Sequence, residues 1–590
     1  MSLSEIPPGL ILVFGAILVP FLPCAIRKWY VIALPILAFF QVMVLPEGEH
    51  LQRELLAGFG DVTLLRVDRL SRAFAYIFTL NAAVTFVFAF YVKKKTQHVA
   101  SLVYVGSALG VVFAGDLLTL YIFWELMAVS SAFIILSRGT RRASGAAFRY
   151  VMIHLLGGLF LLAGMVVTFQ ATGSLAFEGF GVGEGAGPWL ILVGFLVNVA
   201  APPLASWLPD GYPEASVTGG VVLSAYTTKT AVYTLLRAFE GWDILIWVGC
   251  IMTIYGLVYA LLENDMRRVL AYSIVNQVGF MVCAAGIGGE MAINGATAHA
   301  ICHIIYKSLL WMAAGAVLYR VGKSKGTELG GLYRAMPWTM VFCMVGAFTT
   351  LSMPLTSGFT SKPMILQAAD SAHLFWPWLF LEIASAGAVL HAGIKFPYFV
   401  FFNEDRGLRP KEAPRSMLIA MGILAFLCLY FGMRPGLLYE VLPYPVEFSA
   451  YKASKVIGQL QLLFFSALAF FVFLKLVQPM RGISLDWDWF YRKGTPLFVG
   501  GVGRILNGAN ALTHGVVVRG FLPRVNRFFR EAPAVILCWM LVPVWVASGK
   551  TPAQIAAKRE VMYVRAQRGV FPVGVTVCLA VLLLAFLFLF

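Results

Sequence analysis

Three ionisable residues recur at intervals of four in the stretch from Gly295 to Leu310, GATAHAICHIIYKSLL. His299, His303 and Lys307 are separated there almost entirely by apolar residues. Four residues turn an α-helix by about 400°, so the three side chains lie on one face, roughly 6 Å apart along the axis. A charge at the centre of a bilayer costs about 3 kcal/mol on insertion scales. A single histidine is more often satisfied inside a helix bundle, but the regular stripe indicates a path for protons or cations.

Four more ionisable residues interrupt apolar segments elsewhere. Glu125 lies in LTLYIFWELMAVSSAF, Lys229 in VVLSAYTTKTAVYTLL, and Lys362 follows a proline-interrupted run. Lys395, in LHAGIKFPYFVFF, lies nearer a helix end, where its ammonium group can snorkel. One acid and several lysines make a poor site for a hard metal ion, which prefers several carboxylate or carbonyl oxygens. They suit a proton relay, because a desolvated lysine and a histidine can both exchange protons near neutral pH.

The composition is that of a polytopic membrane protein. Of the 590 residues 60% are hydrophobic and 13% charged, and the mean hydropathy is +0.81. The first residues carry no basic n-region and a second apolar run follows, so we do not expect a cleavable signal. The eight cysteines form no CxxC pair, so no iron–sulfur or zinc site and no other cofactor is expected. The net charge of +16 reflects the placement of loops and does not imply nucleic acid.

Apolar segments of spanning length follow one another through most of the chain, which predicts an all-α fold with a fourteen-helix core. They fall near residues 8–25, 29–46, 70–93, 98–114, 116–137, 147–171, 188–212, 216–238, 243–262, 268–288, 293–320, 338–370, 376–403 and 415–432.

The basic loops predict the orientation. Connections after segments 1, 3, 5, 9, 11 and 13 carry Arg and Lys, whereas those after even segments are neutral or acidic, and the connection after segment 7 is an exception. The positive-inside rule then places the N-terminus outside and the odd-to-even loops in the cytoplasm. We therefore expect a multi-pass protein of the cell (inner) membrane.

Two apolar segments are interrupted by helix-breaking residues. One contains Pro202 and Pro203, and the other contains Pro354 and Gly358. Each is the fourth segment of a five-segment block, and blocks with an odd number of spans insert in opposite orientations. The pattern predicts two inverted repeats, 98–240 and 241–405, after the N-terminal helices of residues 1–97. Broken helices at matched positions indicate an ion or substrate site at the midplane, although prolines also merely kink membrane helices.

The pattern changes after residue 405. Residues 406–478 are expected to form helices 14 and 15, and 479–568, rich in Arg and Gly, a cytoplasmic element. Within it the apolar run 535–548 has only about 14 residues, so we expect it to lie in the membrane interface. Residues 569–590 are predicted to form a final transmembrane helix.

Six motifs in order resemble a known family over about residues 65–405. They are WELM around Glu125, WLPDGYPEA at 207–215, TTKTAVYTLLR at 227–237, DMRRVLAYS at 265–273, HAICHIIYK at 299–307 and SGFTSK at 357–362. They resemble the antiporter-like proton-pumping subunits of respiratory complex I, the large subunits of Mrp-type cation/proton antiporters and the membrane arms of related hydrogenases. ISLDWDWFYRKG at 483–494 resembles the tail of the Mrp D-type subunit, which makes the D-type the nearest match.

The resemblance implies a fourteen-helix core with helices 7 and 12 broken. It also implies an axis of Glu125, Lys229, Lys307 and Lys362 that carries protons, with His299 and His303 matching histidines beside the central lysine. Its partners would be other membrane subunits within the lipid bilayer, and its ions either H⁺ alone or H⁺ exchanged for Na⁺ or K⁺. A final transmembrane helix after a lateral element also fits the longest complex I subunit of this type.

The sequence departs from the family pattern at two positions. Asn198 stands where a lysine normally pairs with the glutamate, and Arg267 replaces the lysine of a D-x-K-R motif. Arginine does not release its proton, so Arg267 is expected to orient a loop. Without the lysine at 198, we predict a direct Glu125–Lys229 pair beside a hydrated gap, because an unpaired acid and an unpaired lysine cost more than a pair.

Two other classes of function stay open. A small-solute secondary carrier should have a polar or aromatic pocket beside its broken helices. A non-conducting structural subunit, supporting a redox or inorganic-carbon partner, would explain the loss of a relay lysine at Asn198. No catalytic chemistry of the chain's own is expected in any of these cases.

Overall fold

The computed structural model describes residues 6–54, 61–480, 482, 485–569 and 573–589. The chain divides into two compact units, Met1–Asp488 and Trp489–Phe590. The first unit holds every residue predicted to take part in a relay. Ile483 and Ser484 of the ISLDWDWFYRKG stretch lie outside the described residues.

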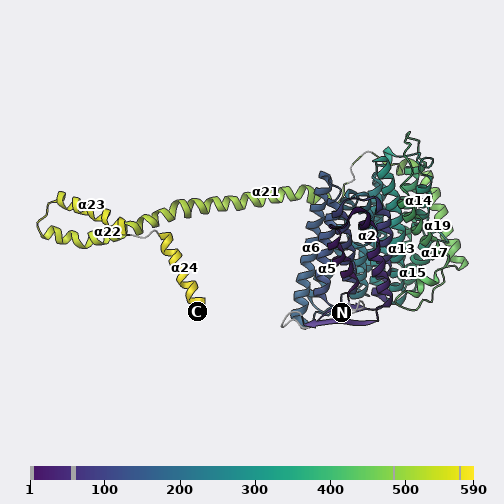
Figure 1. Ribbon diagram of the computed structural model, residues 1–590, viewed down its shortest axis with the longest axis horizontal. Coiled ribbons are helices and arrows are strands. Elements are labelled where there is room, and N and C mark those ends of the chain that lie inside the picture. Colours follow the sequence, from purple (N-terminus) through teal and green to yellow (C-terminus); the bar gives the residue numbers. More distant parts are fainter. Residues whose placement is uncertain (1–5, 55–60, 481, 483–484, 570–572, 590) are drawn as a thin grey trace. The chain divides into compact units, whose positions relative to one another are not determined.

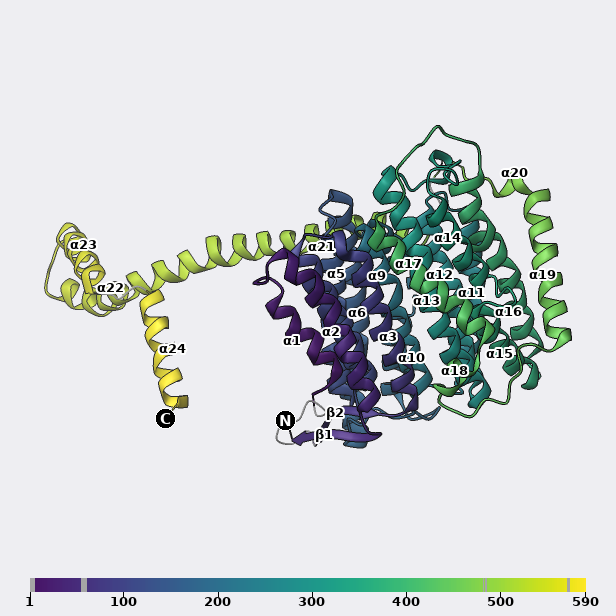
Figure 2. The same ribbon diagram turned by 45° about the vertical axis from the view of Figure 1, so that its right-hand side comes forward.

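The first unit is a bundle of long helices that run side by side (Figures 1 and 2). Its first half contains α1 (Pro8–Leu18), α2 (Cys24–Val44), α3 (Arg69–Phe88), α4 (Lys95–Phe113), α5 (Leu117–Leu136), α6 (Arg141–Thr172), α7 (Ala186–Asn198), α8 (Trp207–Gly211), α9 (Val217–Ala225) and α10 (Thr227–Ala238). Its second half contains α11 (Asp243–Leu262), α12 (Met266–Ile287), α13 (Gly289–Val321), α14 (Pro337–Thr350), α15 (Ser357–Ser371), α16 (Phe375–Ala388), α17 (Arg415–Met433), α18 (Gly436–Glu440), α19 (Ala453–Val472) and α20 (Leu474–Val477). Wide π-helical turns extend α16 over Val389–Lys395 and Tyr398–Phe402.

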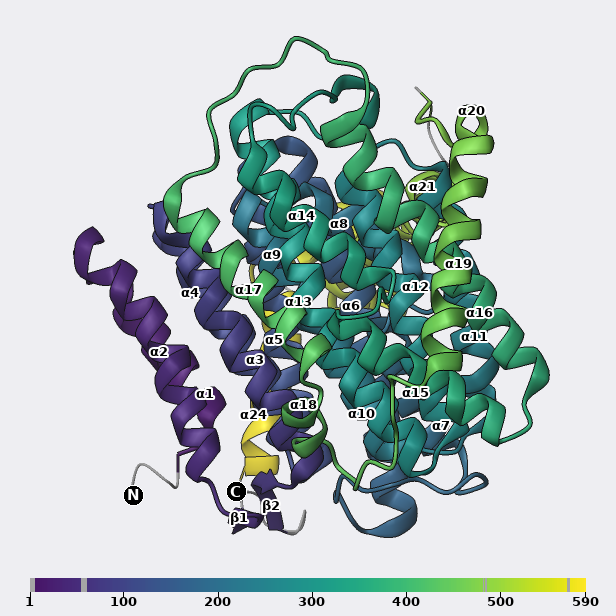
Figure 3. The ribbon, with the colours of Figure 1, turned by 90° about the vertical axis from the view of Figure 1, so that its right-hand side faces the viewer.

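Helices α12 and α13 form the interior of this bundle (Figure 3). Both are buried along nearly their whole length, including their polar residues. A helix that is buried on every face is surrounded by other helices. The ionisable stripe of α13 is therefore held away from the outer surface of the bundle.

Both predicted helix breaks are present. The first separates α7 from α8, and Ala200 there has a φ of 62°. The second separates α14 from α15, where Ser352 and Leu355 have φ of 57° and 71°. These are left-handed conformations that residues with a side chain rarely adopt. Gly358 allows a close approach, because a Cβ there would lie 2.0 Å from the carbonyl oxygen of Thr349.

A third break was not predicted. The segment at 216–238 is divided at Tyr226 into α9 and α10, although neither proline nor glycine occurs there. Side chains of neighbouring helices hold the break instead. Tyr226 donates its hydroxyl to the carbonyl oxygen of Phe78 at 3.1 Å, and the backbone N–H of Thr227 donates to the hydroxyl of Tyr104 at 2.9 Å.

The number of spans differs from the prediction. Among the described residues, 12 helices are long and apolar enough to cross a membrane. The helices α1, α7 and α14 are apolar but shorter, since α1 has 11 residues and the other two are halves of broken helices. The fourteen-helix count is therefore not confirmed. The apolar pattern of the sequence treats the two halves of a broken helix as one span, and it does not show that α1 is short.

The fold is also not entirely helical. Strands β1 (Gly48–Glu54) and β2 (Asp61–Val67) form an antiparallel hairpin before α3. Val62, Leu65 and Val67 of β2 are buried, and the carbonyl oxygen of Thr63 accepts a hydrogen bond from the N–H of Gly115 at 3.0 Å. The polar composition of β1 gives no apolar alternation, which is why the sequence did not predict it.

The second unit consists of helices whose described side chains are mostly exposed. They are α21 (Asp488–Thr513), a π-helical stretch (His514–Phe521), α22 (Leu522–Ala547), α23 (Pro552–Gly569) and α24 (Val573–Leu589). The apolar run expected to lie in the membrane interface, 535–548, does not form a helix of its own, because residues 535–547 belong to α22. Pro533 and Pro543 lie inside α22, and neither ends it.

Candidate functional site

The predicted stripe lies on α13, and its three side chains are fully buried. Lys307 donates from Nζ to Oγ of Ser273 on α12 at 2.5 Å. His299 donates from Nε2 to Oε1 of Gln277 on α12 at 3.2 Å, and its Nδ1 lies 3.3 Å from Oγ of Ser361 on α15. The stripe thus connects α12 and α15 through groups that can donate and accept protons.

Two buried imidazoles have no hydrogen-bond partner for either ring nitrogen among the described residues, His303 and His391. His303 packs edge-on against Tyr306, with ring centroids 5.2 Å apart. His391 lies in the π-helical extension of α16 and was not predicted. The signal was available, because His391 precedes Lys395 by four residues, the spacing that drew attention to His303 and Lys307.

Lys362 joins the two halves of a broken helix. It lies in the second turn of α15 and donates from Nζ to the carbonyl oxygen of Thr350, the last residue of α14, at 3.2 Å. The carbonyl end of a helix carries partial negative charge, so this is a favourable place for an ammonium group. Its Nζ also lies 5.3 Å from the ring centroid of Phe280. The field of Lys362 acts on Lys307.

Glu382 of α16 is an acid beside this lysine's helix that the sequence did not single out as a relay residue. The charges of Glu382 and Lys362 act on each other. Glu382 lines a cavity of about 290 Å³ together with Gln367, Asp370 and Lys455. Glu382 stands alone in the apolar run WPWLFLEIASAGAVL, just as Glu125 stands alone in its segment, so isolation in an apolar run was the available signal.

Lys229 occupies the corresponding place at the third break. It lies in the first turn of α10, is fully buried, and donates from Nζ to the carbonyl oxygen of Ser224 on α9 at 2.6 Å. The field of Lys307 acts on Lys229. The three lysines therefore form one electrostatic row through α10, α13 and α15.

Glu125 is not paired with Lys229. In the described part of the chain no ion pair joins them, so the predicted direct pair is wrong. The carboxylate of Glu125 instead lies against α6, where a Cβ added at Gly158 would come within 1.8 Å of Oε1. That oxygen is buried and has no hydrogen-bond partner among the described residues. Lys229 donates instead to the carbonyl oxygen of Ser224 on α9.

Asn198, the last residue of α7, forms a hydrogen bond that the sequence did not predict. Its Oδ1 accepts from Nδ1 of His154 on α6 at 2.8 Å. The imidazole packs against the rings of both Tyr150 and Trp207, with centroids 4.1 and 4.5 Å away, and these two rings also contact each other. A lone histidine in VMIHLLGG gives no periodic signal, so nothing in the sequence distinguished it from a core histidine.

Two other buried cations hold backbone carbonyls. Arg267 donates to three carbonyl oxygens between Pro213 and Ser216 at 2.7–3.1 Å, so it orients the loop between α8 and α9. Lys395 donates to three carbonyl oxygens at the C-terminal end of α11 at 2.5–3.3 Å. Lys395 is fully buried and does not snorkel, because the end of α11 supplies its partners within the bundle.

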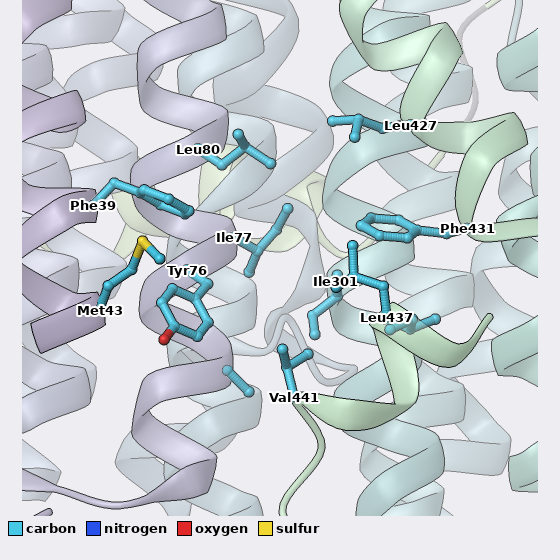
Figure 4. A pocket seen from close by; sticks show the side chains of 12 residues that line it. Phe39, Met43, Tyr76, Ile77, Leu80, Ile301, Leu427, Phe431, Leu437 and Val441 are labelled. Carbon is cyan, nitrogen blue, oxygen red and sulfur yellow. The ribbon is translucent and has the colours of Figure 1, made fainter. Parts of the chain in front are cut away.

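An apolar cavity lies apart from the helix breaks (Figure 4). It has a volume of about 390 Å³ and is lined by side chains of α2, α3, α13, α17 and the region of α18. None of its described lining residues comes from α7, α8, α14 or α15. It is therefore not the polar pocket beside the breaks that a solute carrier would need.

Residues 114–387 match the family model described as NADH:quinone oxidoreductase/Mrp antiporter, transmembrane. The A1 subunit of a Na⁺/H⁺ antiporter from Staphylococcus aureus is 27% identical over 503 residues, which cover 74% of this chain and 62% of the relative. The A subunit of a Na⁺/H⁺ antiporter from Alkalihalophilus pseudofirmus is 29% identical over 483 residues, 72% of this chain and 60% of the relative.

Two solved structures share the fold. A chain of the Mrp complex from Dietzia sp. superposes with a TM-score of 0.66 at 19% identity, over 75% of this chain and 96% of that chain. A chain of the membrane-bound sulfane sulfur reductase, an archaeal respiratory membrane complex, superposes with a TM-score of 0.70 at 22% identity, over 91% and 99% of the two chains. Residues 114–387 of this multi-pass chain are therefore similar to that family, and the chain shares the fold of these two solved chains.

The predicted resemblance to antiporter-like subunits is confirmed at this level. The chain spans about 60% of the length of the curated relatives it matches, 62% and 60% for the two above. Both relatives are A-type by name, so they do not support the predicted D-type identity. That prediction rested on the short stretch at 483–494, which lies outside the part matched by the family model.

Proposed function

We propose that this antiporter-like chain is a membrane component of a multi-subunit complex in the cell membrane that translocates protons or exchanges Na⁺ or K⁺ for protons. A row of three buried lysines, Lys229, Lys307 and Lys362, carries the proposal. In the described part of the chain no carboxylate forms an ion pair with any of them. Unpaired ammonium groups are costly inside a membrane, so structure alone gives no reason to keep three.

The row supplies a relay. Neighbouring positive charges repel, so protonation of one lysine favours release of a proton from the next. His299, His303 and the hydroxyl of Ser273 lie along the same path as groups that pass protons. In this proposal Glu125 belongs to one end of the row, and Lys362 with Glu382 to the other. Arg267 and Lys395 donate hydrogen bonds to backbone carbonyl oxygens and do not take part in proton transfer in this proposal.

The finer architecture is also part of the proposal. Residues 98–240 and 241–405 are two inverted repeats, supported by a broken helix in each. Loop charge supports an N-terminus outside and a cytoplasmic element at 479–568. The partners are other membrane subunits, as the relatives' names suggest. The D-type identity remains a prediction from residues 483–494 only.

Substitution of Lys307 tests the relay. Lys307→Ala in membrane vesicles that carry the whole complex should abolish formation of a pH gradient, followed with a fluorescent dye, while the amount of assembled complex stays unchanged. Lys307→Arg is the matched variant. It keeps the charge but cannot release a proton, so it should be equally inactive.

A normal pH gradient in assembled Lys307→Ala would contradict the proposal. The non-conducting structural role would then be the better description, since the absence of a lysine at Asn198 already points in that direction. Recovery of transport by Lys307→Arg would show that a fixed charge suffices, which also contradicts a relay.

A further inference from the structure

A buried histidine outside the row of lysines lies at the first helix break. His154 of α6 donates its Nδ1–H to Oδ1 of Asn198 at 2.8 Å. A neutral imidazole has one donor and one acceptor nitrogen, so this hydrogen bond leaves Nε2 with a free lone pair. His154 is therefore held in the tautomer that can accept a proton at Nε2.

His154 lies on the face of α6 that meets Glu125. Gly158 follows His154 by four residues, one helical turn, and the carboxylate of Glu125 packs directly against Gly158. Gly157, beside it, packs on Val197 of α7, the neighbour of Asn198, at 3.2 Å from a Cβ added there. Glu125, His154 and Asn198 thus come from three helices to one region.

Each of these three residues has a buried polar atom without a partner among the described residues. They are Oε1 of Glu125, Nε2 of His154 and Nδ2 of Asn198. A buried polar atom left without a hydrogen bond costs about 1–3 kcal/mol. Folded proteins satisfy groups of such atoms with ordered water, provided that several polar partners converge. These three atoms are of mixed donor and acceptor type and come from adjoining helices, so they are suited to bind such a water.

The surroundings of His154 are buried and aromatic. The rings of Tyr150 and Trp207 lie 4.1 and 4.5 Å from the imidazole, centroid to centroid, in tilted and edge-on arrangements. The charged groups where α8 packs on α6, Arg149 and Asp210, form an ion pair at 2.7 Å. α7 carries no ionisable residue. The acid that packs on α6 one turn from His154 is Glu125 of α5.

We propose that His154 carries protons between Glu125 and the break of α7, and that Asn198 is the positioning residue that sets its tautomer. The inference rests on the proposed function. It assigns the first half of the bundle a titratable group at the break, in addition to Lys229.

The test compares variants in membrane vesicles that carry the complex, with the dye-reported pH gradient measured per assembled complex. His154→Gln should lower the initial rate at least about tenfold, because general acid–base groups contribute factors of this size or more. His154→Phe keeps the aromatic packing against Tyr150 and Trp207 and should be equally slow. The control is His98→Gln. His98 is also buried, but it bonds to the carbonyl oxygen of Val92 at 3.1 Å, away from this region, so the rate should stay within about twofold.

A second site distinguishes proton transfer from packing. Asn198→Lys in the His154→Phe background returns a titratable group to the break and should recover at least about a third of the parent rate. Parent-rate transport by assembled His154→Phe would overturn the inference, and so would a slow variant that Asn198→Lys fails to restore. If Lys307→Ala abolishes transport and His154→Phe transports at the parent rate, only this inference fails. If both transport normally, the proposed function fails.

Discussion

The two halves of the bundle both contain a broken helix at the predicted position, but the residues that bond at the two breaks differ in charge. In the second half the break carries a charge, because Lys362 of α15 donates to the last carbonyl of α14, at Thr350. In the first half the break between α7 and α8 is neutral, and Asn198 accepts a hydrogen bond from His154. The lysine of this half, Lys229, lies at an additional break in the next apolar segment.

The comparison shows what a buried lysine requires. Lys229 and Lys362 each follow a break and donate to a carbonyl oxygen of the preceding half-helix, at 2.6 and 3.2 Å. A helix that ends inside the bundle leaves carbonyls without intrahelical partners, and these stabilise an ammonium group without a counter-charge. Asn198 instead ends α7 itself. A neutral amide at that position leaves the task of carrying charge to other groups, and this is the difference that the following variants examine.

The largest loss of transport is expected from substitution of Lys229, and the same substitution of Lys395 is its control. Lys229→Ala removes the only lysine of the first half that belongs to the row, so transport in vesicles should fall below detection. Lys395→Ala should leave the rate per assembled complex within about twofold but lower the thermal stability, because hydrogen bonds from a charged group contribute about 1.5–3 kcal/mol each. Thermal unfolding and dye fluorescence measure both quantities. Loss of transport in a stable Lys395→Ala variant would show that the two lysines do not differ in role.

A smaller effect is expected from Glu382→Gln in the second half. The charge of Glu382 acts on Lys362, but Asp370 lines the same cavity and can replace it in part. The rate of pH-gradient formation should therefore fall about three- to tenfold, less than for a lysine of the row. Gln367→Ala alters the same cavity without removing a charge and should transport at the parent rate. An unchanged rate in Glu382→Gln would place the end of the path elsewhere.

The features that could be predicted from sequence are those with a period or a breaker. The spacing of His299, His303 and Lys307 shows the face of α13 directly, and the prolines mark two breaks. The break at Tyr226 could not be predicted, because hydrogen bonds to Phe78 and Tyr104, more than 100 residues away, hold it.

The predicted ion pair was wrong for the same reason, that contacts between residues distant in the sequence decide it. Which atom a side chain meets depends on the direction of its helix and on its neighbours. The Glu125–Lys229 pair was wrong because Lys229 reaches the Ser224 carbonyl and Glu125 packs on Gly158. Glu382 was visible in the sequence as an isolated acid, and only the cavity and the field of Lys362 show its place beside the row.

The smallest change moves Glu125 without altering its chemistry. A methyl group at Gly158 would come within 1.8 Å of Oε1, the end of a flexible side chain, so in Gly158→Ala the carboxylate must rotate away from α6 and from His154. If the first half conducts through these two residues, the rate should fall about two- to tenfold although every titratable group is still present. Gly145→Ala on the same helix is the control, because a methyl group there meets only the guanidinium of Arg149, at 3.4 Å. A parent rate in both variants, together with a normal pH gradient in Glu125→Gln, would show that the path runs through the second half alone.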